Sequence, residues 1–211
     1  MNGIIRTHSP PPIARKAPDM TPKSDAVTAE VIAATRTWIE RAVIGLNLCP
    51  FAKAVHVKEQ IRYVVSDAQS PEALIEDLRR ELSTLDKASP ADIATTLLIH
   101  PRVLTDFRDY NDFLESADEL VVEMDLEGVI QVASFHPRYQ FSKTTPENVI
   151  NCTNRSPYPT LHLLREADVD AAVAAFPDAK LIYERNIATL RKLGVAGWRA
   201  LGVDAPDGRK Q

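Results

Sequence analysis

The sequence predicts an α/β protein with a small, mainly parallel sheet in a βαβαβ core. Three short segments rich in β-branched and aliphatic residues, 61–65, 95–99 and 129–134, are predicted as strands. The two segments between them, 74–85 and 107–121, place apolar residues at helical spacing. Connections through helices return the chain to the same edge of a sheet, so we expect neighbouring strands to be parallel.

Length and composition are those of one globular domain. The chain has 211 residues, of which 45% are hydrophobic and 26% are charged. Residues 1–23 hold five of the fifteen prolines and few large apolar side chains, which predicts a disordered tail. We expect the domain to span residues 24–202 and residues 203–211 to be frayed.

An N-terminal helix precedes the core. Ser24 and Asp25 are suited to cap it, and apolar residues within 27–46 fall on one helical stripe. The helix should end near Cys49-Pro50, because a proline disfavours helical backbone in the residue before it.

The remaining elements follow from local signals. Ser70-Pro71-Glu72 combines a cap, a proline and an acid, which is typical of a helix start. After the third strand, residues 135–159 lose periodicity and are predicted as a long ordered loop. A C-terminal helical segment is expected over 159–166, 168–175 and 177–193, with Gly194 ending the last helix.

Charge and cysteine content exclude several classes of protein. Residues 1–23 carry four basic side chains and one acidic one, or +3, so the rest of the chain carries −7 to give the total of −4. An acidic body lacks the positive field that nucleic-acid binding requires. Two cysteines, no apolar leader and no run of about 18 apolar residues predict a cytoplasmic protein without a disulfide framework or membrane span.

Two of the predicted strands end in the same dipeptide, His100-Pro101 and His136-Pro137. In an open parallel sheet, ligands bind beyond the carboxyl ends of the strands, so both imidazoles are expected on one binding edge. Histidine suits proton transfer near neutral pH, which makes His100 and His136 candidate acid–base residues. The alternative is that each imidazole only hydrogen-bonds the backbone nearby.

The segment from Asn154 through Arg155 and Ser156 is predicted to lead into a helix. A helix N-terminus with an arginine beside it would form an anion pocket. His162 and Arg165 could face that pocket from the helix, and Tyr139 could form its wall. Alternatively, the polar groups cap the turn, Arg155 pairs with a structural acid, and the helix face is only solvated.

Cys49 is a candidate nucleophile if the end of the N-terminal helix reaches the same edge, with a packing thiol as the alternative. A metal site formed by His100, His136 and His162 with Cys49 or Asp67 is a weaker hypothesis, because no tight ligand spacing occurs. The chain has no Gly-rich phosphate loop, so the sequence predicts no particular cofactor.

Three strings together carry a family resemblance: Gly45-Leu46-Asn47-Leu48-Cys49-Pro50-Phe51-Ala52-Lys53, Val132-Ala133-Ser134-Phe135-His136-Pro137 and Thr153-Asn154-Arg155-Ser156-Pro157-Tyr158-Pro159. With them, the chain resembles a bacterial family of uncharacterised proteins, a domain of unknown function, over roughly residues 28–200. The resemblance implies no activity, substrate or catalytic residue.

The leading hypothesis is therefore a small enzyme that acts on an anionic metabolite at the carboxyl edge of the sheet. Arg155 would hold the anion, His100 or His136 would act as acid or base, and Cys49 would be the nucleophile. The alternative is a non-catalytic sensor or adaptor that binds a ligand or a metal.

Overall fold

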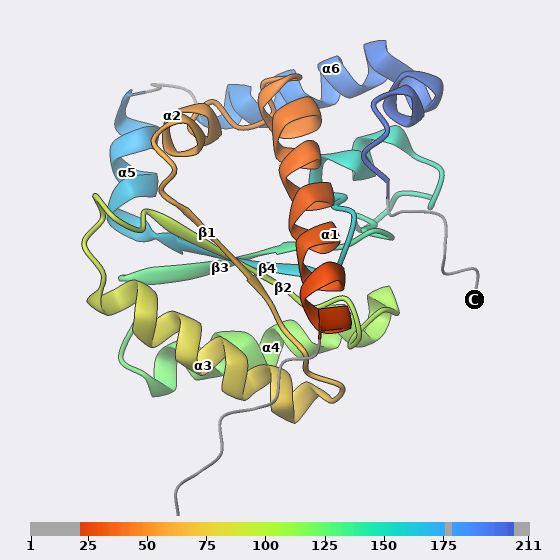
Figure 1. Ribbon diagram of the computed structural model, residues 1–211. Helices are drawn as coiled ribbons and strands as arrows, with labels where there is room; N and C mark the ends of the chain where they lie inside the picture. The colour runs from red at the N-terminus through yellow and green to blue at the C-terminus, as the bar shows by residue number, and fades with distance from the viewer. Residues whose placement is uncertain (1–21, 176–178, 205–211) are drawn as a thin grey trace, which may run out of the picture.

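A four-stranded sheet with helices on both faces forms the centre of the protein (Figure 1). The computed structural model describes residues 22–175 and 179–204. The strands are β1 (Ile61–Val65), β2 (Thr95–Ile99), β3 (Ile130–Phe135) and β4 (Thr160–Arg165), in the spatial order β1-β2-β4-β3. The predicted α/β class and the three predicted strands are thus confirmed, with β3 displaced by one residue.

The expected mainly parallel sheet is wrong. Only β1 and β2 pair in parallel, whereas β4 pairs antiparallel with both β2 and β3. Because β2 and β3 are each antiparallel to β4, they run in the same direction as one another and as β1. The carboxyl ends of β1, β2 and β3 therefore still lie at one edge of the sheet.

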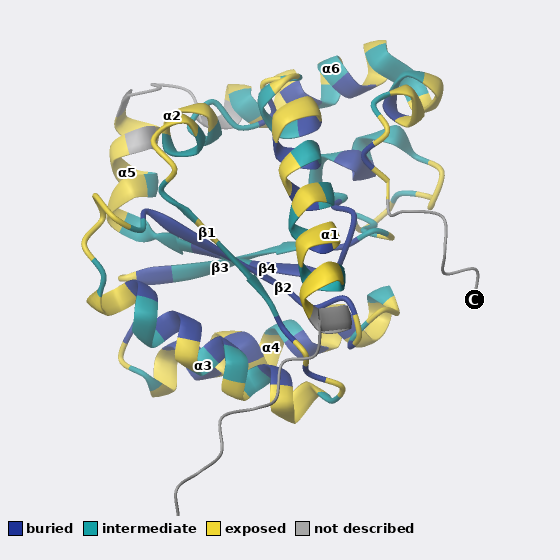
Figure 2. Cartoon of the chain, in the orientation of Figure 1, coloured by how far each residue is buried: buried dark blue, intermediate teal, exposed yellow. Residues whose placement is uncertain are grey.

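Helices α3 (Pro71–Lys87) and α4 (Phe107–Glu123) cover one face of the sheet (Figure 1). The predicted cap is present, since the Ser70 hydroxyl accepts a hydrogen bond from the Ala73 N–H at 3.3 Å. The apolar side of each helix is buried (Figure 2). The largest fully buried side chains of this layer are Leu74, Leu78, Leu82, Leu85, Leu98, Tyr110, Ile130, Leu161 and Leu163.

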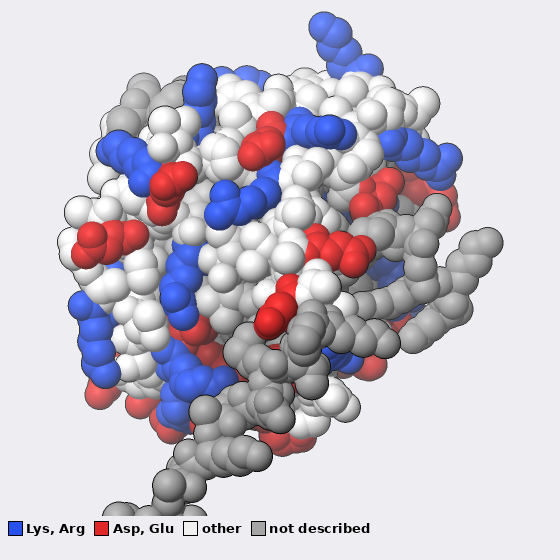
Figure 3. Space-filling model, viewed as in Figure 1, with Lys and Arg blue, Asp and Glu red and all other residues white. Residues whose placement is uncertain are grey.

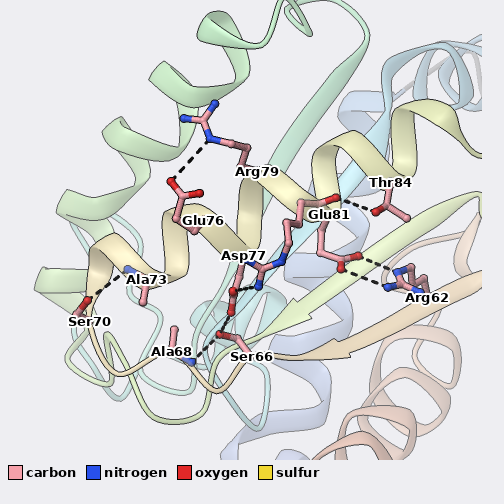
Figure 4. Close-up of polar contacts among 11 residues, drawn as sticks. Arg62, Ser66, Ala68, Ser70, Ala73, Glu76, Asp77, Arg79, Glu81 and Thr84 are labelled. Carbon is pink, nitrogen blue, oxygen red and sulfur yellow. Dashed lines mark hydrogen bonds and ion pairs between the residues drawn. The ribbon is translucent and has the colours of Figure 1, made fainter. Parts of the chain in front are cut away.

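Two polar contacts join α3 to β1 and to the residue that follows β1 (Figure 4). The hydroxyl of Ser66, which directly follows β1, donates to an Asp77 carboxylate oxygen at 2.5 Å. Further along, the Arg62 Nε lies 2.7 Å from a carboxylate oxygen of Glu81. These contacts fix the position of α3 relative to the carboxyl end of β1.

The other face carries α1 (Pro22–Trp38), a π-helical continuation η1 (Ile39–Ile44) and α6 (Ala179–Ala200). Their buried side chains include Val31, Trp38, Ile39 and Leu190, which cluster with Leu97 and Ile99 of β2. The N-terminal helix begins two residues before the predicted cap and ends at Ile44, short of Cys49. A short helix α2 (Ala52–Val57), not predicted, leads into β1.

The predicted helix over 159–166 is also wrong, because this segment forms β4. A 3-10 helix η2 (Val149–Asn154) precedes the strand, and α5 (Glu166–Ala175) follows it. Gly194 does interrupt the last helix, with φ +68° in the left-handed region, yet another helical turn follows.

Residues 1–21 and 205–211 of the predicted tails lie outside the described residues, while Pro22 and Lys23 belong to α1 and Val203 is buried. Within the described part, no helix combines the length and apolar character needed to cross a membrane. Basic and acidic side chains are interspersed on the described surface seen in Figure 3.

Candidate functional site

Two histidines stand at the carboxyl edge of the sheet, one after β2 and one after β3. His100 and His136 are both fully buried, and the ring of Tyr110 from α4 packs against each of them. The ring centroids of His100 and Tyr110 are 5.6 Å apart, and those of Tyr110 and His136 are 5.1 Å apart. The two imidazoles are thus brought to one edge, as the sequence predicts, and both pack against the same tyrosine.

Both imidazoles hydrogen-bond the backbone of the loop before α4. The Nδ1 of His100 lies 3.0 Å from the Val103 carbonyl oxygen, and the Nε2 of His136 lies 3.3 Å from the Leu104 carbonyl oxygen. Since a carbonyl only accepts, each of these nitrogens carries the proton. The second nitrogen of His136 accepts the Arg138 N–H at 3.0 Å, whereas the Nε2 of His100 has no partner among the described residues.

Burial keeps both imidazoles neutral. Loss of solvation lowers the pKa of His100 to about 4 and that of His136 to about 4, although each hydrogen bond to a carbonyl opposes the shift. For His136, the nearby Arg138 guanidinium also lowers the pKa. At neutral pH, neither residue is a ready proton donor.

A pocket of about 300 Å³ opens beside His136. Its walls come from the start of α4, the loop after β3 and the residue after η2. We call it the arginine pocket. The residues that line it are Asp106, Phe107, Arg108, Pro137, Arg138, Gln140, Pro146 and Arg155.

The three arginines of the pocket differ in how firmly they are held. Arg155 donates from Nε to the Tyr139 carbonyl oxygen at 3.2 Å and from Nη2 to the Pro146 carbonyl oxygen at 2.6 Å. Arg138 donates from Nη2 to the Thr105 carbonyl oxygen at 2.5 Å. No hydrogen bond or ion pair joins the exposed Arg108 side chain to another described residue.

Asp106 is the single acid in this lining. Its Oδ1 caps α4 by accepting the Arg108 N–H at 2.8 Å, and its Oδ2 lies 3.4 Å from the Nη2 of Arg138. The cap hydrogen bond and the guanidinium of Arg138 lower the pKa of this carboxyl group. Three cations against one anion leave the lining with a formal excess of two positive charges.

His136 stands behind the arginine pocket. Its ring centroid lies 5.4 Å from that of Phe107, which lines the pocket, and the ring centroid of Tyr139 lies 5.1 Å from that of Phe107. Because Arg138 N–H donates to His136 Nδ1, the imidazole fixes the backbone from which that guanidinium extends. His136 therefore acts on the pocket through its neighbours.

Of the three predicted loop residues, Arg155 lines the pocket, whereas Asn154 and Ser156 hydrogen-bond the backbone and are not among the lining residues. Asn154 donates from Nδ2 to the Ser134 carbonyl oxygen at 3.2 Å, and Ser156 donates to the Tyr158 carbonyl oxygen at 2.6 Å. The helix start expected after Arg155 is wrong, since β4 begins there. The helix terminus at the pocket belongs to α4.

His162 and Arg165, expected on a helix facing the anion, lie on β4 instead. The Nε2 of His162 is 2.7 Å from the Thr95 hydroxyl, which itself donates to the Leu163 carbonyl oxygen. Arg165 is at the end of β4 that lies at the other edge of the sheet from His100 and His136. It donates from Nη2 to the carbonyl oxygens of Leu85 and Ala88 at 2.6 and 2.7 Å. Both side chains make structural contacts away from the pocket.

Cys49 lies in the turn between η1 and α2 and is partly exposed. Its neighbour Leu48 packs in the cluster on the α1 side, whereas His100 stacks on Tyr110 of the α4 layer. No contact between described residues joins the Cys49 thiol to His100 or His136. No group of three or more His, Cys, Asp or Glu residues within the described ranges is arranged to hold a metal ion.

The residues that sequence reasoning missed are Asp106, Arg108 and Arg138. The sequence did contain a signal for an arginine near each histidine. Each His-Pro strand end is followed by arginine, in His100-Pro101-Arg102 and His136-Pro137-Arg138. Arg102 forms an ion pair with Asp67 at 2.8 Å, while Arg138 lines the pocket. Asp106 was recognisable as a helix cap ahead of the apolar stripe of α4.

The model of a protein family described as "Protein of unknown function (DUF1415)" matches residues 30–200 of the chain. The chain belongs to this family. The match includes the whole sheet, the arginine pocket and both histidines, so the site described here lies within the family domain. No curated protein and no solved structure matches the chain.

Proposed function

We propose that this protein binds a small anionic metabolite in the arginine pocket. The observation that carries the proposal is the convergence of Arg108, Arg138 and Arg155, from three separate segments, on one pocket of about 300 Å³. A guanidinium is a planar fork that matches carboxylate and phosphate oxygens. The volume is at the lower end of that of typical ligand pockets, which favours a small ligand.

The structure around the pocket supports binding of an anion in preference to proton transfer by the histidines. The hydrogen-bonding nitrogens of His136 are both engaged with the backbone, and burial holds its pKa at about 4. Acid–base catalysis by His100 or His136, with Cys49 as nucleophile, stays a hypothesis from the sequence. We assign His136 the role of positioning Arg138 at the pocket wall.

The test is thermal unfolding of the full chain in the presence of small carboxylates and phosphate esters. A ligand at 100 times its Kd should stabilise the native state by about 2.7 kcal/mol and raise the Tm. Arg108→Gln should abolish the rise, because this exposed side chain lines the pocket. Arg102→Gln is the matched control, since Arg102 lies outside the pocket lining and pairs with Asp67.

The proposal fails if no anion raises the Tm of the wild-type chain. It also fails if Arg108→Gln and Arg102→Gln respond to the same ligand as the wild type does, because binding would then take place elsewhere.

A further inference from the structure

The start of α4 already carries a carboxylate of the chain itself. Asp106 already accepts the Arg108 N–H at 2.8 Å, so the positive end of the helix is compensated by a carboxylate of the chain itself. A second anion at this position would meet that carboxylate. A ligand in the pocket must therefore be held by guanidinium groups.

Those guanidinium groups retain unused donors. An arginine side chain has five N–H donors. Arg155 uses Nε and Nη2 for two carbonyl oxygens and also interacts with the Cys152 thiol, which orients its guanidinium without occupying all five N–H groups. Arg138 uses Nη2 for Thr105 and Asp106, and the Arg108 side chain makes no hydrogen bond or ion pair with another described residue. Donors thus approach the pocket from three segments.

The charge and shape of the lining discriminate between anions. Its formal excess of two positive charges matches a dianion better than a monocarboxylate. Three separate guanidinium groups are also better matched by a tetrahedral phosphate with three terminal oxygens than by a planar carboxylate with two. Phe107, Pro137 and Pro146 form an apolar part of the lining for the organic remainder of the ligand.

We propose that the arginine pocket recognises a phosphomonoester, with the phosphate among Arg108, Arg138 and Arg155 and an apolar remainder against Phe107. This inference rests on the proposed function and names the class of ligand that the same site takes. We expect the Arg108 side chain to move toward the bound phosphate and donate to it. Arg108 is the pocket arginine whose side chain makes no hydrogen bond or ion pair with a described residue, so no such contact has to break.

The experiment is isothermal titration calorimetry of the full chain with three probes: phenyl phosphate, benzoate and succinate. We expect phenyl phosphate to bind at least about tenfold more tightly than either carboxylate. Arg108→Gln should weaken phenyl phosphate about tenfold or more, whereas Arg102→Gln should leave its affinity unchanged.

The pH dependence supplies a second readout. The second pKa of a phosphomonoester is about 6, so at lower pH the phosphate takes up a proton and becomes a monoanion. The affinity of phenyl phosphate for the pocket should therefore fall about tenfold between about pH 7.5 and 5. The charged groups that line the pocket are Asp106 and Arg108 from the start of α4, Arg138 after β3 and Arg155 after η2, and the titratable His136 packs behind Phe107. Over this range Asp106 stays ionised and His136 stays largely neutral, so the change comes from the ligand.

The outcomes separate the two proposals. If succinate or benzoate binds as tightly as phenyl phosphate, and Arg108→Gln weakens it, the phosphomonoester inference is overturned while anion binding in the pocket stands. If phenyl phosphate binds equally at both pH values, the dianion requirement is overturned. If none of the three probes binds at millimolar concentration, and the anions of the Tm screen have no effect, both proposals are overturned.

Discussion

Tyr110 connects three segments at the carboxyl edge of the sheet. Its hydroxyl donates to the Thr160 carbonyl oxygen at 2.9 Å and accepts the Phe135 N–H at 3.1 Å. Its ring packs against both His100 and His136. Burial raises the pKa of the phenol, which keeps the hydroxyl able both to donate and to accept. One side chain thereby ties α4 to the end of β3 and the start of β4.

Tyr110→Phe should destabilise the protein by about 1–3 kcal/mol, because a buried carbonyl and a part-buried N–H lose their partner while the ring packing is kept. Urea denaturation followed by circular dichroism measures the change. Tyr183→Phe is the control, since Tyr183 is 51% exposed and its hydroxyl makes no hydrogen bond to a described residue in this structure. Equal stability of the two variants would contradict the connecting role of Tyr110.

At the scale of elements, β4 is the feature that distinguishes this fold from a simple βαβαβ unit. It lies between β2 and β3 and pairs with both. Leu161 and Leu163 face the α3 and α4 layer and are fully buried, while His162 and Leu164 point to the other face and are partly buried. A helix over the same residues would instead place Leu161 and Leu164 on one side.

Single truncations distinguish the strand from the helix. Leu163→Ala should cost about 2–5 kcal/mol, because it opens a cavity in a fully buried layer. Leu164→Ala should cost clearly less, since that side chain is only partly buried. Denaturant unfolding of the two variants provides the comparison. A larger loss for Leu164→Ala than for Leu163→Ala would contradict the alternation of β4.

At the scale of the whole molecule, burial holds three of the described histidines neutral, His100 and His136 fully buried and His162 partly buried. Burial lowers the pKa of His100, His136 and His162 to about 4 in each case. In the unfolded chain a histidine titrates near pH 6.5. Between these values the unfolded state binds more protons than the native state, so the native state loses stability as the pH falls.

The free energy of unfolding should therefore decrease from about pH 6.5 to 5, with a contribution of at most about 1.4 kcal/mol per pH unit from each of these histidines. Above about pH 5 most carboxylates of the unfolded chain are ionised, which isolates the histidine contribution. Urea denaturation across this range measures the slope.

His100→Asn removes one titrating group and keeps an N–H donor for the Val103 carbonyl oxygen, so its slope should be shallower than that of the wild type. A wild-type stability that does not change between about pH 5 and 6.5 would show that the histidines are not buried as neutral groups.

Part of the site could be predicted because its signals are local. The Ser70 cap, the apolar stripes of α3 and α4 and the His-Pro strand ends each depend on a few neighbouring residues. Arg155 was predicted to bind an anion because a helix start was expected beside it. No helix starts there, yet the arginine does line the pocket. Arg108 and Arg138 were missed, because nothing in one short segment shows that they meet.

The sequence by itself determined the helices α3 and α4, the strands β1, β2 and β3, and the shared edge at which His100 and His136 lie. These follow from periodicity and caps, which act over a few residues. Only the tertiary structure decided that residues 160–165 form the strand between β2 and β3, because in so short a segment Leu161 and Leu164 fit a helical face as well as Leu161 and Leu163 fit one face of a strand. Only long-range packing decided which donors the pocket receives, since Arg108 and Arg155 lie far apart along the chain and meet through the fold.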